Sequence, residues 1–534
     1  MRSLRILLPA LFSVTTSAFA AVPPAQQADL IVYGGTASGV MTSYAAAREG
    51  LHVILLEPGT HLGGMVTGGL SATDTANFHV IGGYARDFYR QAAAHYGPQS
   101  ETLDERFDWL SEPHVGEAIF TEWLKKTGVE VRFHERLKEK GGVTKTGTHV
   151  TGLATEDGKS WEAKVYADCS YEGDLMAQAK ITYTVGREST KVYDESLAGV
   201  RVDTPQHQFR WKISPYDDHH KLMPEVDPGP MGDNGEGDKK VQSYNLRLIL
   251  TNDPANRLPW TRPAGYNAAR FALLARYLKE FPEHMNRAPK LGDVMNPVAI
   301  PNHEADFNNN GPFSTDYIGK SWSYPDASYA ERKRIWDAHM LYTQSFLWFL
   351  SSDPSVPESL RAETNSWGRA KDEFADTDHW PNQLYIREGR RMVGEYVMHQ
   401  ADLQTDRTKP DSVGMGSYNS DSHNIQRVAM PDGSVRNEGD VQVPVNPYEI
   451  SFRSILPKPQ EAENLLVPVC LSASHVAYSS VRMEPQYMIV GQAAGVAAAM
   501  AVHAKIPVQK ISVAELQKNL NEHGAILHLD QAAQ

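Results

Sequence analysis

The stretch from Asp29 to Glu57 constrains the fold of this chain more than any other. A short apolar run, Leu30-Ile31-Val32-Tyr33, passes into six small residues, Gly34-Gly35-Thr36-Ala37-Ser38-Gly39. An alanine-rich segment follows, and a second apolar run, Val53-Ile54-Leu55-Leu56, ends at the glutamate. Two such runs, joined by a helix pattern, predict a parallel β-α-β unit in which a tight turn precedes the helix.

This turn has the residue types that the pyrophosphate of a dinucleotide requires. Gly34 permits the tight turn, Gly39 lets helix and strand pack closely, and the helix N-terminus offers free N–H groups. Glu57 stands where a carboxylate accepts hydrogen bonds from an adenosine ribose. Thr36 replaces the second glycine of the usual pattern, so its side chain must point away from the phosphates, or the dinucleotide must sit slightly higher.

We therefore expect a dinucleotide at this turn, the alternative being a β-α-β unit without nucleotide. The expected contacts are Gly34, Gly35, Thr36, Ala37, Ser38, Gly39, Glu57 and Pro58.

Residues 1–20 have the pattern of a signal peptide. Two arginines precede an apolar stretch from Ile6 to Val14, and Ala18-Phe19-Ala20 supplies small residues for cleavage. No later apolar run reaches the roughly 18 residues that a transmembrane helix needs. We expect an exported protein, periplasmic or extracellular, with no membrane span after signal removal. The alternative is an N-terminal core helix.

The charge balance argues against a nucleic-acid partner. The chain has 52 Lys and Arg against 65 Asp and Glu, a formal net charge of -13, and no clustered basic run to neutralise phosphates. Its 2 cysteines, Cys169 and Cys470, are too few for a disulfide scaffold and form no Cys-x-x-Cys pair. We expect both to be core thiols.

The residues after Glu57 indicate which dinucleotide binds. Pro58 to Gly69 is rich in glycine, which a plain nicotinamide-binding domain does not need. Here the sequence resembles the FAD-dependent oxidoreductase family of the glutathione-reductase-2 type of flavoproteins. The resemblance implies FAD as cofactor, with Gly63, Gly64 and Met65 beside the flavin. His61 raises the alternative of covalent attachment, although noncovalent FAD is favoured.

The resemblance continues in three further places. Residues 112–115 with 128–133 look like the element on the adenine side, and residues 165–174 look like the flavoprotein strand-and-turn motif. Residues 464–475 lead to a last helix at Gly491, whose N-terminus is expected to face the flavin. The implied FAD contacts are Val131, Asp168, Glu172, Gly173, Asp174, Gly491, Gln492, Ala493 and Ala494.

The predicted fold is α/β, a three-layer Rossmann-like FAD-binding domain with an inserted α+β substrate domain. The FAD-binding domain is expected at 28–190 and 461–505, the insertion at 191–460, and a C-terminal tail at 506–534. Within the insertion we expect a strand at 208–212 and helices around 264–280, 328–350 and 392–399.

Polar residues of the insertion are candidates for binding substrate. Residues 416–424 combine hydroxyls, amides, a carboxylate and an imidazole, which suits a polyhydroxylated ligand, although a surface turn is an equal alternative. Residues 306–311 copy half of a calcium loop, but Tyr317 stands where the bidentate glutamate should be, so we expect no metal. The substrate-binding candidates are Ser417, Tyr418, Asn419, Asp421, Asn309 and Arg387.

His475 and Arg482 are the main catalytic candidates, together with His423 and Asn424. If the resemblance holds, His475 takes a hydroxyl proton while a hydride leaves for flavin N5, and Arg482 holds a substrate oxygen. The alternative for His475 is a structural hydrogen bond. For the charged run from Arg387 to Arg391, a salt-bridge cluster is the favoured interpretation.

These observations predict an exported FAD oxidoreductase that oxidises a hydroxyl-bearing C–H of a carbohydrate or similar polar small molecule. The electron acceptor is left open. Two alternatives remain: a redox-neutral, flavin-assisted lyase or glycoside-cleaving enzyme, and a glycan-binding module whose cofactor site has decayed.

Overall fold

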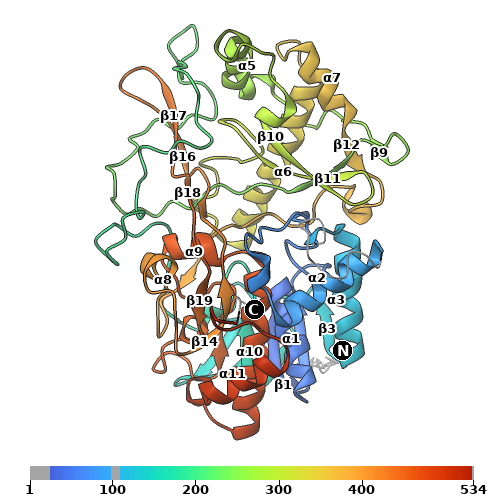
Figure 1. Ribbon diagram of the computed structural model, residues 1–534, viewed down its shortest axis with the longest axis vertical. Coiled ribbons are helices and arrows are strands. Elements are labelled where there is room, and N and C mark those ends of the chain that lie inside the picture. The colour runs from blue at the N-terminus through green and yellow to red at the C-terminus, as the bar shows by residue number, and fades with distance from the viewer. Residues whose placement is uncertain (1–24, 98–108, 532–534) are drawn as a thin grey trace, which may run out of the picture.

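The computed structural model describes residues 25–97 and 109–531, so the predicted signal peptide lies outside the described residues. Two large sheets organise the described chain, a seven-stranded sheet with a parallel centre and a five-stranded antiparallel sheet. The first lies in the lower half of Figure 1 and the second in the upper half.

The seven-stranded sheet contains the glycine-rich unit of the sequence. In order across the sheet, its strands are β3 (Glu130–Phe133), β2 (Val53–Glu57), β1 (Gln26–Tyr33), β6 (Ser160–Asp168), β5 (His149–Ala154) and β4 (Val143–Thr146), with β20 (Leu465–Leu466) beside the end of β6. The strands β3, β2, β1, β6 and β20 run parallel, and β4 and β5 form an antiparallel hairpin.

Both faces of this sheet are covered. Leu30 and Val32 of β1 point into the larger core, whereas Ile31 and Tyr33 pack on the opposite face with residues of the β4–β5 hairpin. All four side chains are at most 2% exposed, which explains the unbroken apolar run of this strand. The helices on the larger-core side are α1 (Ala37–Arg48), α2 (Gly83–His95), α3 (Pro113–Thr127) and α10 (Glu484–Ala504). The predicted Rossmann-like α/β fold is confirmed.

Helices α1 and α10 pack with their backbones in close approach. A Cβ atom on Gly491 would lie 2.5 Å from the carbonyl oxygen of Ser38, and one on Gly495 would lie 2.4 Å from that of Thr42. By length and composition α10 could cross a membrane, but 83% of its apolar window is buried inside the protein. A helix that is apolar on all sides and enclosed in this way is a core helix.

The five-stranded sheet and three helices form the upper half of the molecule (Figure 1). The strands, in order, are β10 (Met295–Ile300), β11 (Glu304–Asn309), β8 (Leu248–Thr251), β12 (Gly368–Ala370) and β9 (Arg257–Leu258), and the helices are α5 (Ala272–Met285), α6 (Tyr329–Ser352) and α7 (Glu358–Ser366). The helix patterns at 264–280 and 328–350 correspond to α5 and α6.

Four short antiparallel pairs complete the chain. They are β7 (Tyr183–Thr184) with β13 (Arg391–Met392), β14 (Ser412–Gly416) with β19 (Tyr448–Ser451), β15 (Ser420–Ser422) with β18 (Val441–Val443), and β16 (Gln426–Ala429) with β17 (Val435–Glu438). The remaining helices are α4 (Asp174–Gln178), α8 (Gln400–Gln404), α9 (His475–Val481) and α11 (Val513–Glu522).

The packing of α10 bears on two of the predicted boundaries. β14 and β19 lie inside the predicted insertion 191–460, yet β14 packs against α10, so this part of the chain returns to the lower half of the molecule (Figure 1). The predicted tail 506–534 contains α11, which packs against α10 and buries Leu516 and Leu520. An amphipathic helix with two buried leucines belongs to the core rather than to a tail.

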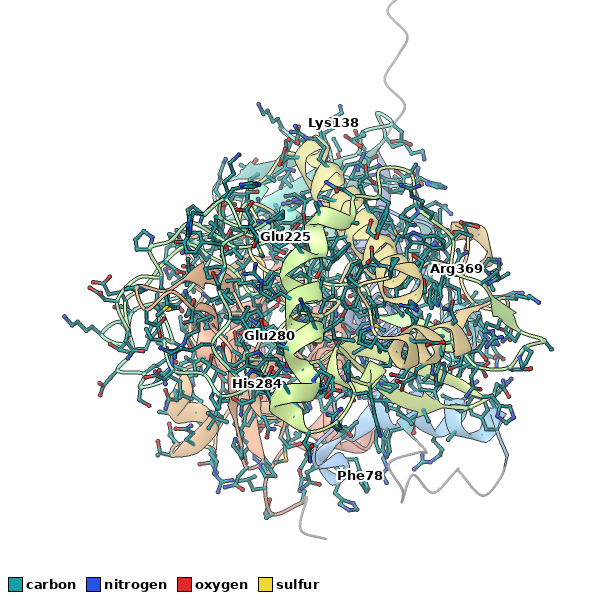
Figure 2. All side chains as sticks on the ribbon, turned by 90° about the horizontal axis from the view of Figure 1, so that it is seen from above. Phe78, Lys138, Glu225, Glu280, His284 and Arg369 are labelled. Atoms are coloured by element: carbon teal, nitrogen blue, oxygen red, sulfur yellow. The ribbon has the colours of Figure 1, made fainter. Side chains whose placement is uncertain are left out.

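The predicted strand at 208–212 is wrong. Trp211 lies flat against α5, stacked at 4.6 Å on Tyr277 and at 4.5 Å on His284, and its Nε1 donates to Glu280. Figure 2 shows Glu280 and His284 along this helix. The apolar pattern of the segment therefore reflects packing on a helix and not on a sheet.

The predicted helix at 392–399 is also absent. The N–H of Met398, which in a helix would donate to the carbonyl of Gly394, donates to the carbonyl of Ser472 at 3.0 Å. Neighbouring segments therefore take the hydrogen bonds that a helix would have made internally.

The close approach of α1 and α10 gives a stability prediction. The change Gly495→Ala places a methyl group against Thr42 and Ala45, so we expect it to lower the free energy of unfolding by about 1–3 kcal/mol in urea denaturation. Gly292→Ala is the control, because a Cβ there meets no atom within 4 Å. Equal stability of Gly495→Ala and the unchanged protein would show that the helices lie farther apart.

Candidate active site

The turn after β1 has the shape that its glycines predict. Gly34 has a φ of +99°, and a Cβ there would lie 2.8 Å from the backbone nitrogen of Ser170. A Cβ on Gly39 would lie 1.9 Å from the carbonyl oxygen of Gly34. Both positions therefore exclude side chains, and the first turn of α1 lies directly against the strand.

Thr36 points away from the open side of this turn. Its Oγ1 donates to the carbonyl of Cys169 at 2.8 Å and accepts from the N–H of Gly39 at 3.2 Å. The hydroxyl thus caps α1 and ties it to the end of β6. Of the two outcomes that the sequence left open for Thr36, these hydrogen bonds favour the first.

Glu57 closes the other side of the turn. Its carboxylate accepts from the N–H of Gly35 at 2.6 Å and from the N–H of Gly59 at 2.5 Å. Burial raises the pKa of Glu57 to about 7, although these two hydrogen bonds oppose the shift. The group therefore titrates near neutral pH.

Two cavities adjoin this turn, and Trp336 lines both. One, of about 220 Å³, is lined by Gly35, Thr36, Glu57, Gly59, Thr60, His61, Gly64, Trp336, Thr377, Asn382 and Gln383. The other, of about 390 Å³, is lined by Tyr33, Pro58, Arg136, Glu172, Asp174, Tyr324, Tyr329, Arg332, Lys333 and Trp336. Backbone without side chains at the turn and a carboxylate at the end of β2 fit the dinucleotide expected there.

The second glycine-rich segment packs onto the first. The N–H of Gly63 donates to the carbonyl of Gly35 at 2.7 Å, and a Cβ on Gly64 would lie 2.4 Å from the hydroxyl oxygen of Tyr171. The same hydroxyl accepts from the N–H of Met65 and donates to Glu484, the first residue of α10. Residues 63–65 thus lie between the dinucleotide turn and the N-terminus of α10.

Some predicted cofactor residues have structural partners instead. Asp168 accepts from Ser170 and Met176, and Asp174 forms ion pairs with Arg332 and Arg390. These carboxylates shape the loop after β6 and attach it to the upper half of the molecule.

The structure also gives the place of other predicted cofactor residues on their elements. Val131 lies within β3, and Gly173 has the positive φ of the turn before α4. Gly491, Gln492, Ala493 and Ala494 lie inside α10, not at its start. The helix N-terminus that the sequence placed at Gly491 is at Glu484, because the small residues face α1 along the middle of the helix.

His61 lines the smaller cavity, but both of its ring nitrogens have carboxylate partners. Nδ1 is 3.2 Å from Glu117, and Nε2 is 3.0 Å from Asp376. The hydrogen bond with Glu117 is the main cause of a raised His61 pKa. This arrangement favours noncovalent FAD.

The catalytic candidate His475 lies in a buried ionic network. It is the first residue of α9, and its Nδ1 lies 2.8 Å from Glu388. Although burial disfavours the charge, His475 and Arg391 hold the pKa of Glu388 at about 2. Because this carboxylate only accepts, Nδ1 donates and Nε2 is the basic ring nitrogen. Glu388 also accepts from Gln242 at 3.0 Å.

A second network holds His423. Its Nδ1 lies 2.8 Å from Asp316, whose other oxygen lies 2.9 Å from Arg387. Burial lowers the pKa of His423 to about 3, with Arg387 acting in the same direction. The imidazole is therefore neutral at physiological pH. Gln242 joins the two networks, since its side-chain oxygen accepts from the N–H of His423.

Arg482 belongs to the same region. It lies two turns after His475, hence on the same side of α9, and donates to the hydroxyl of Tyr385 and to the carbonyl of Asp421. The ring of Tyr385 also lies 4.7 Å from Arg387. Burial raises the pKa of Asp421 to about 6, despite Arg482. The structure thus brings together His475, Arg482, His423, Asp421 and Arg387.

The rest of the polar loop 416–424 has mixed roles. Ser417 bonds to the backbone of Thr75 and Asn77, and the carbonyl of Tyr418 accepts from Ser480. Asn424 is buried, with its Nδ2 directed at the carbonyl of His207. Asn419 is partly buried in the connection between β14 and β15.

The half calcium loop is part of a strand. Residues 304–309 form β11, in which Asn309 pairs with Met295. Asp306 forms a buried two-oxygen ion pair with Arg247. The structure therefore shows a strand where a loop was considered, and the neighbouring Asn308 accepts from Asn245, whose backbone pairs with Tyr385.

Several buried polar atoms around the cluster have no hydrogen-bond partner among the described residues. They are Ser420 Oγ, Ser422 Oγ, Asn424 Oδ1, Arg482 Nε, Glu484 Oε2 and Gln486 Oε1. Their residues are at most 3% exposed. Buried polar atoms are normally paired, so a concentration of unpaired ones is typical of a place where a polar ligand binds.

Sequence reasoning missed important members of this cluster. Glu388 lay in a charged run interpreted as a salt-bridge cluster, and its pair with Arg391 supports that interpretation alongside its contact with His475. No sequence motif marks Asp316, Gln242 or Tyr385, because only the fold brings them near the histidines.

Both cysteines are free and buried, as expected. Burial raises the pKa of the Cys169 thiol and that of Cys470 well above their usual range. A raised pKa disfavours the thiolate form, so neither cysteine is suited to a reaction that needs a thiolate.

Several solved structures overlap with parts of this chain. An L-amino acid deaminase from Proteus vulgaris is 14% identical, covering 33% of this chain and 55% of that chain with a TM-score of 0.24. An L-proline dehydrogenase from P. horikoshii is 14% identical over 31% and 59%, with a TM-score of 0.24. A flavin monooxygenase variant from Stenotrophomonas maltophilia is 20% identical over 27% and 38%, with a TM-score of 0.20. These overlaps cover less than two thirds of each relative and say nothing about the substrate.

Family membership rests on a longer match. No curated protein matches the chain. The sequence pattern of the FAD dependent oxidoreductase family matches residues 29–520, which includes the turn, both glycine-rich segments and α10. The narrower glutathione-reductase-2 type stays a prediction. The chain belongs to the FAD dependent oxidoreductase family, with FAD as its cofactor.

Proposed function

We propose that this enzyme oxidises a hydroxyl-bearing C–H of a carbohydrate or a similar polar small molecule. The observation that carries this proposal is the set of buried, unpartnered hydroxyl, amide and guanidinium atoms beside His475 and His423. Such atoms suit a substrate with several hydroxyl groups, because each can exchange a hydrogen bond with a hydroxyl. An apolar substrate would leave them unpaired, which costs about 1–3 kcal/mol for each group.

Bound FAD supplies the acceptor for the hydride that leaves the substrate carbon. The chain supplies the base: Glu388 holds Nδ1 of His475, so Nε2 accepts the proton of the substrate hydroxyl. Loss of that proton and of the C–H hydride converts the alcohol to a carbonyl group. Arg482, held by Tyr385, provides positive charge for the substrate oxygen as it becomes more negative.

Export is part of the proposal and rests on the signal-peptide pattern of residues 1–20. We infer a periplasmic or extracellular enzyme that meets its substrate outside the cytoplasm. N-terminal sequencing of the protein from a fractionated culture tests this. A mature chain that starts near Ala21 in the exported fraction supports export, and an intact Met1 in the cytoplasm contradicts it.

Glu57 gives a pH prediction for the cofactor. Its pKa is raised to about 7 by burial, and ribose hydroxyls form stronger hydrogen bonds to the ionised form. Binding therefore lowers this pKa, so FAD affinity should rise with pH up to about 7 and then level off, changing up to about tenfold per pH unit below that value. Fluorescence titration with FAD at a series of pH values measures this.

The matching variants are Glu57→Gln and Glu162→Gln. We expect Glu57→Gln to weaken FAD binding by about 10- to 100-fold at pH 8, as hydrogen bonds to a charged group are lost, and to remove the rise with pH. Glu162 is exposed on β6, so Glu162→Gln should leave both the FAD affinity and its rise with pH unaffected. A Glu57→Gln curve that still rises through neutral pH would rule out this role.

His475 gives the prediction for catalysis. Anaerobic mixing with a panel of sugars, polyols and hydroxy acids should bleach flavin absorbance near about 450 nm. We expect His475→Gln to keep its FAD and to slow bleaching by about 10²- to 10⁴-fold, the contribution of a positioned base. The exposed His503→Gln is the control.

The outcomes separate the alternatives. If no hydroxylated compound bleaches the flavin, the substrate class is wrong. If products form by elimination or glycoside cleavage with no net transfer of electrons, the enzyme is the redox-neutral alternative. A purified chain that stays colourless after FAD is added would indicate a binding module.

A further inference from the structure

A cluster of carboxylates lies away from the active-site candidates, between α3 and the five-stranded sheet. Glu112 directly precedes α3, Glu304 is the first residue of β11, and Asp372 follows β12. One oxygen of each lies within 4.8 Å of the others. Oxygens bound to one Ca²⁺ at about 2.3–2.6 Å lie at most about twice that distance apart, so the spacing suits a single ion.

The carboxylates are oriented by neutral groups. Oε2 of Glu112 accepts from the hydroxyl of Tyr96 and the amide of Asn302. The amide of Asn256 donates both to Oε1 of Glu304 at 3.1 Å and to Oδ1 of Asp372 at 2.7 Å. One oxygen of each carboxylate is thus fixed and the other is left over, which is how outer hydrogen bonds orient metal ligands.

The remaining oxygens of the two buried members have no partner. Glu112 is 0% and Glu304 is 2% exposed, and neither Glu112 Oε1 nor Glu304 Oε2 forms a hydrogen bond with any described residue. These two atoms come from different halves of the molecule. Burying unpaired carboxylate oxygens is costly unless a cation compensates them.

No Lys or Arg of residues 25–97 or 109–531 does so, although the imidazole of His114 lies near Glu112. None of their ion pairs involves Glu112, Glu304 or Asp372, and adjacent Glu373 pairs only with the imidazole of His114. Without a bound cation, the three acidic groups would therefore face one another at close range.

We propose that Glu112, Glu304 and Asp372 bind a hard divalent cation, Ca²⁺, which joins α3 to the inserted sheet. Three carboxylates as ligands favour calcium over zinc, because the neighbouring imidazole of His114 is paired with Glu373. The irregular arrangement from three separate elements favours calcium over magnesium. The site is structural. Glu112 directly precedes the helix that contains Glu117, whose carboxylate accepts from the N–H of Leu62 beside the glycine-rich segment.

Calcium binding to the FAD-loaded full chain tests the proposal. The protein is dialysed against EGTA, and its melting temperature and bound metal are measured as CaCl₂ is added. We expect about one equivalent of Ca²⁺ per chain and, at saturating Ca²⁺, a melting temperature about 2 °C higher or more. Mg²⁺ and Zn²⁺ in parallel samples should give smaller shifts.

Glu304→Gln tests the site directly. In EGTA its melting temperature should stay close to that of the unchanged protein, because the amide keeps the size of the side chain, whereas added Ca²⁺ should no longer raise it. Glu122→Gln, on the exposed side of the same helix, should respond to Ca²⁺ as the unchanged protein does. If Glu304→Gln does not fold, the exposed Asp372→Asn takes its place, with a weaker Ca²⁺ response expected.

The proposal is overturned if none of the three metals changes the melting temperature of the unsubstituted protein and less than about 0.1 equivalent of metal is bound. The proposal is also overturned if Glu304→Gln and Asp372→Asn respond to Ca²⁺ as strongly as the unsubstituted protein, because the ion would then bind elsewhere.

Discussion

The contact between α1 and α10 is the interaction on which the rest of the structure depends. The hydroxyl of Thr42 donates to the carbonyl of Gly491 at 3.0 Å, across 449 residues of sequence. This approach is possible only because Gly491 and Gly495 carry no side chains. It aligns the start of α10 with the glycine turn, so that Tyr171 can bridge Met65 and Glu484. The contact thus joins the dinucleotide turn to the catalytic candidates on α9.

The buried titratable groups of the site differ in their protonation states at neutral pH. Ionised Glu388 and Asp316 each hold one imidazole, and His423 stays neutral. Burial raises the pKa of Glu484 to about 8, against the hydrogen bond from Tyr171, so this carboxyl group is mostly protonated at neutral pH. A protonated group at that position can donate as well as accept, which widens the range of polar atoms that it can bind. The site therefore combines fixed charges with adaptable hydrogen-bonding groups.

The sequence allowed prediction of those parts that depend on local pattern. The β-α-β unit was predictable because strand, turn, helix and acid follow one another within one short stretch, and Thr36 could be identified as the exception. Gly491 was misplaced because small residues can mark either the start of a helix or its contact face. Trp211 was misread because an aromatic side chain packs equally well on a helix or a sheet. Asp316 could not be predicted, and neither could the contact of Glu388 with His475, since these partners are distant in sequence.

The order of the strands along the chain affects how the protein folds and when it can bind its cofactor. β1 and the turn lie near one end of the chain, while β20 and α10, which complete the same domain, lie more than four hundred residues later. Contacts of such separation form only after most of the chain is available, and they slow folding. The cofactor therefore meets a finished pocket only when the whole polypeptide is present. For an exported protein that crosses a membrane before it folds, FAD would have to be supplied on the far side.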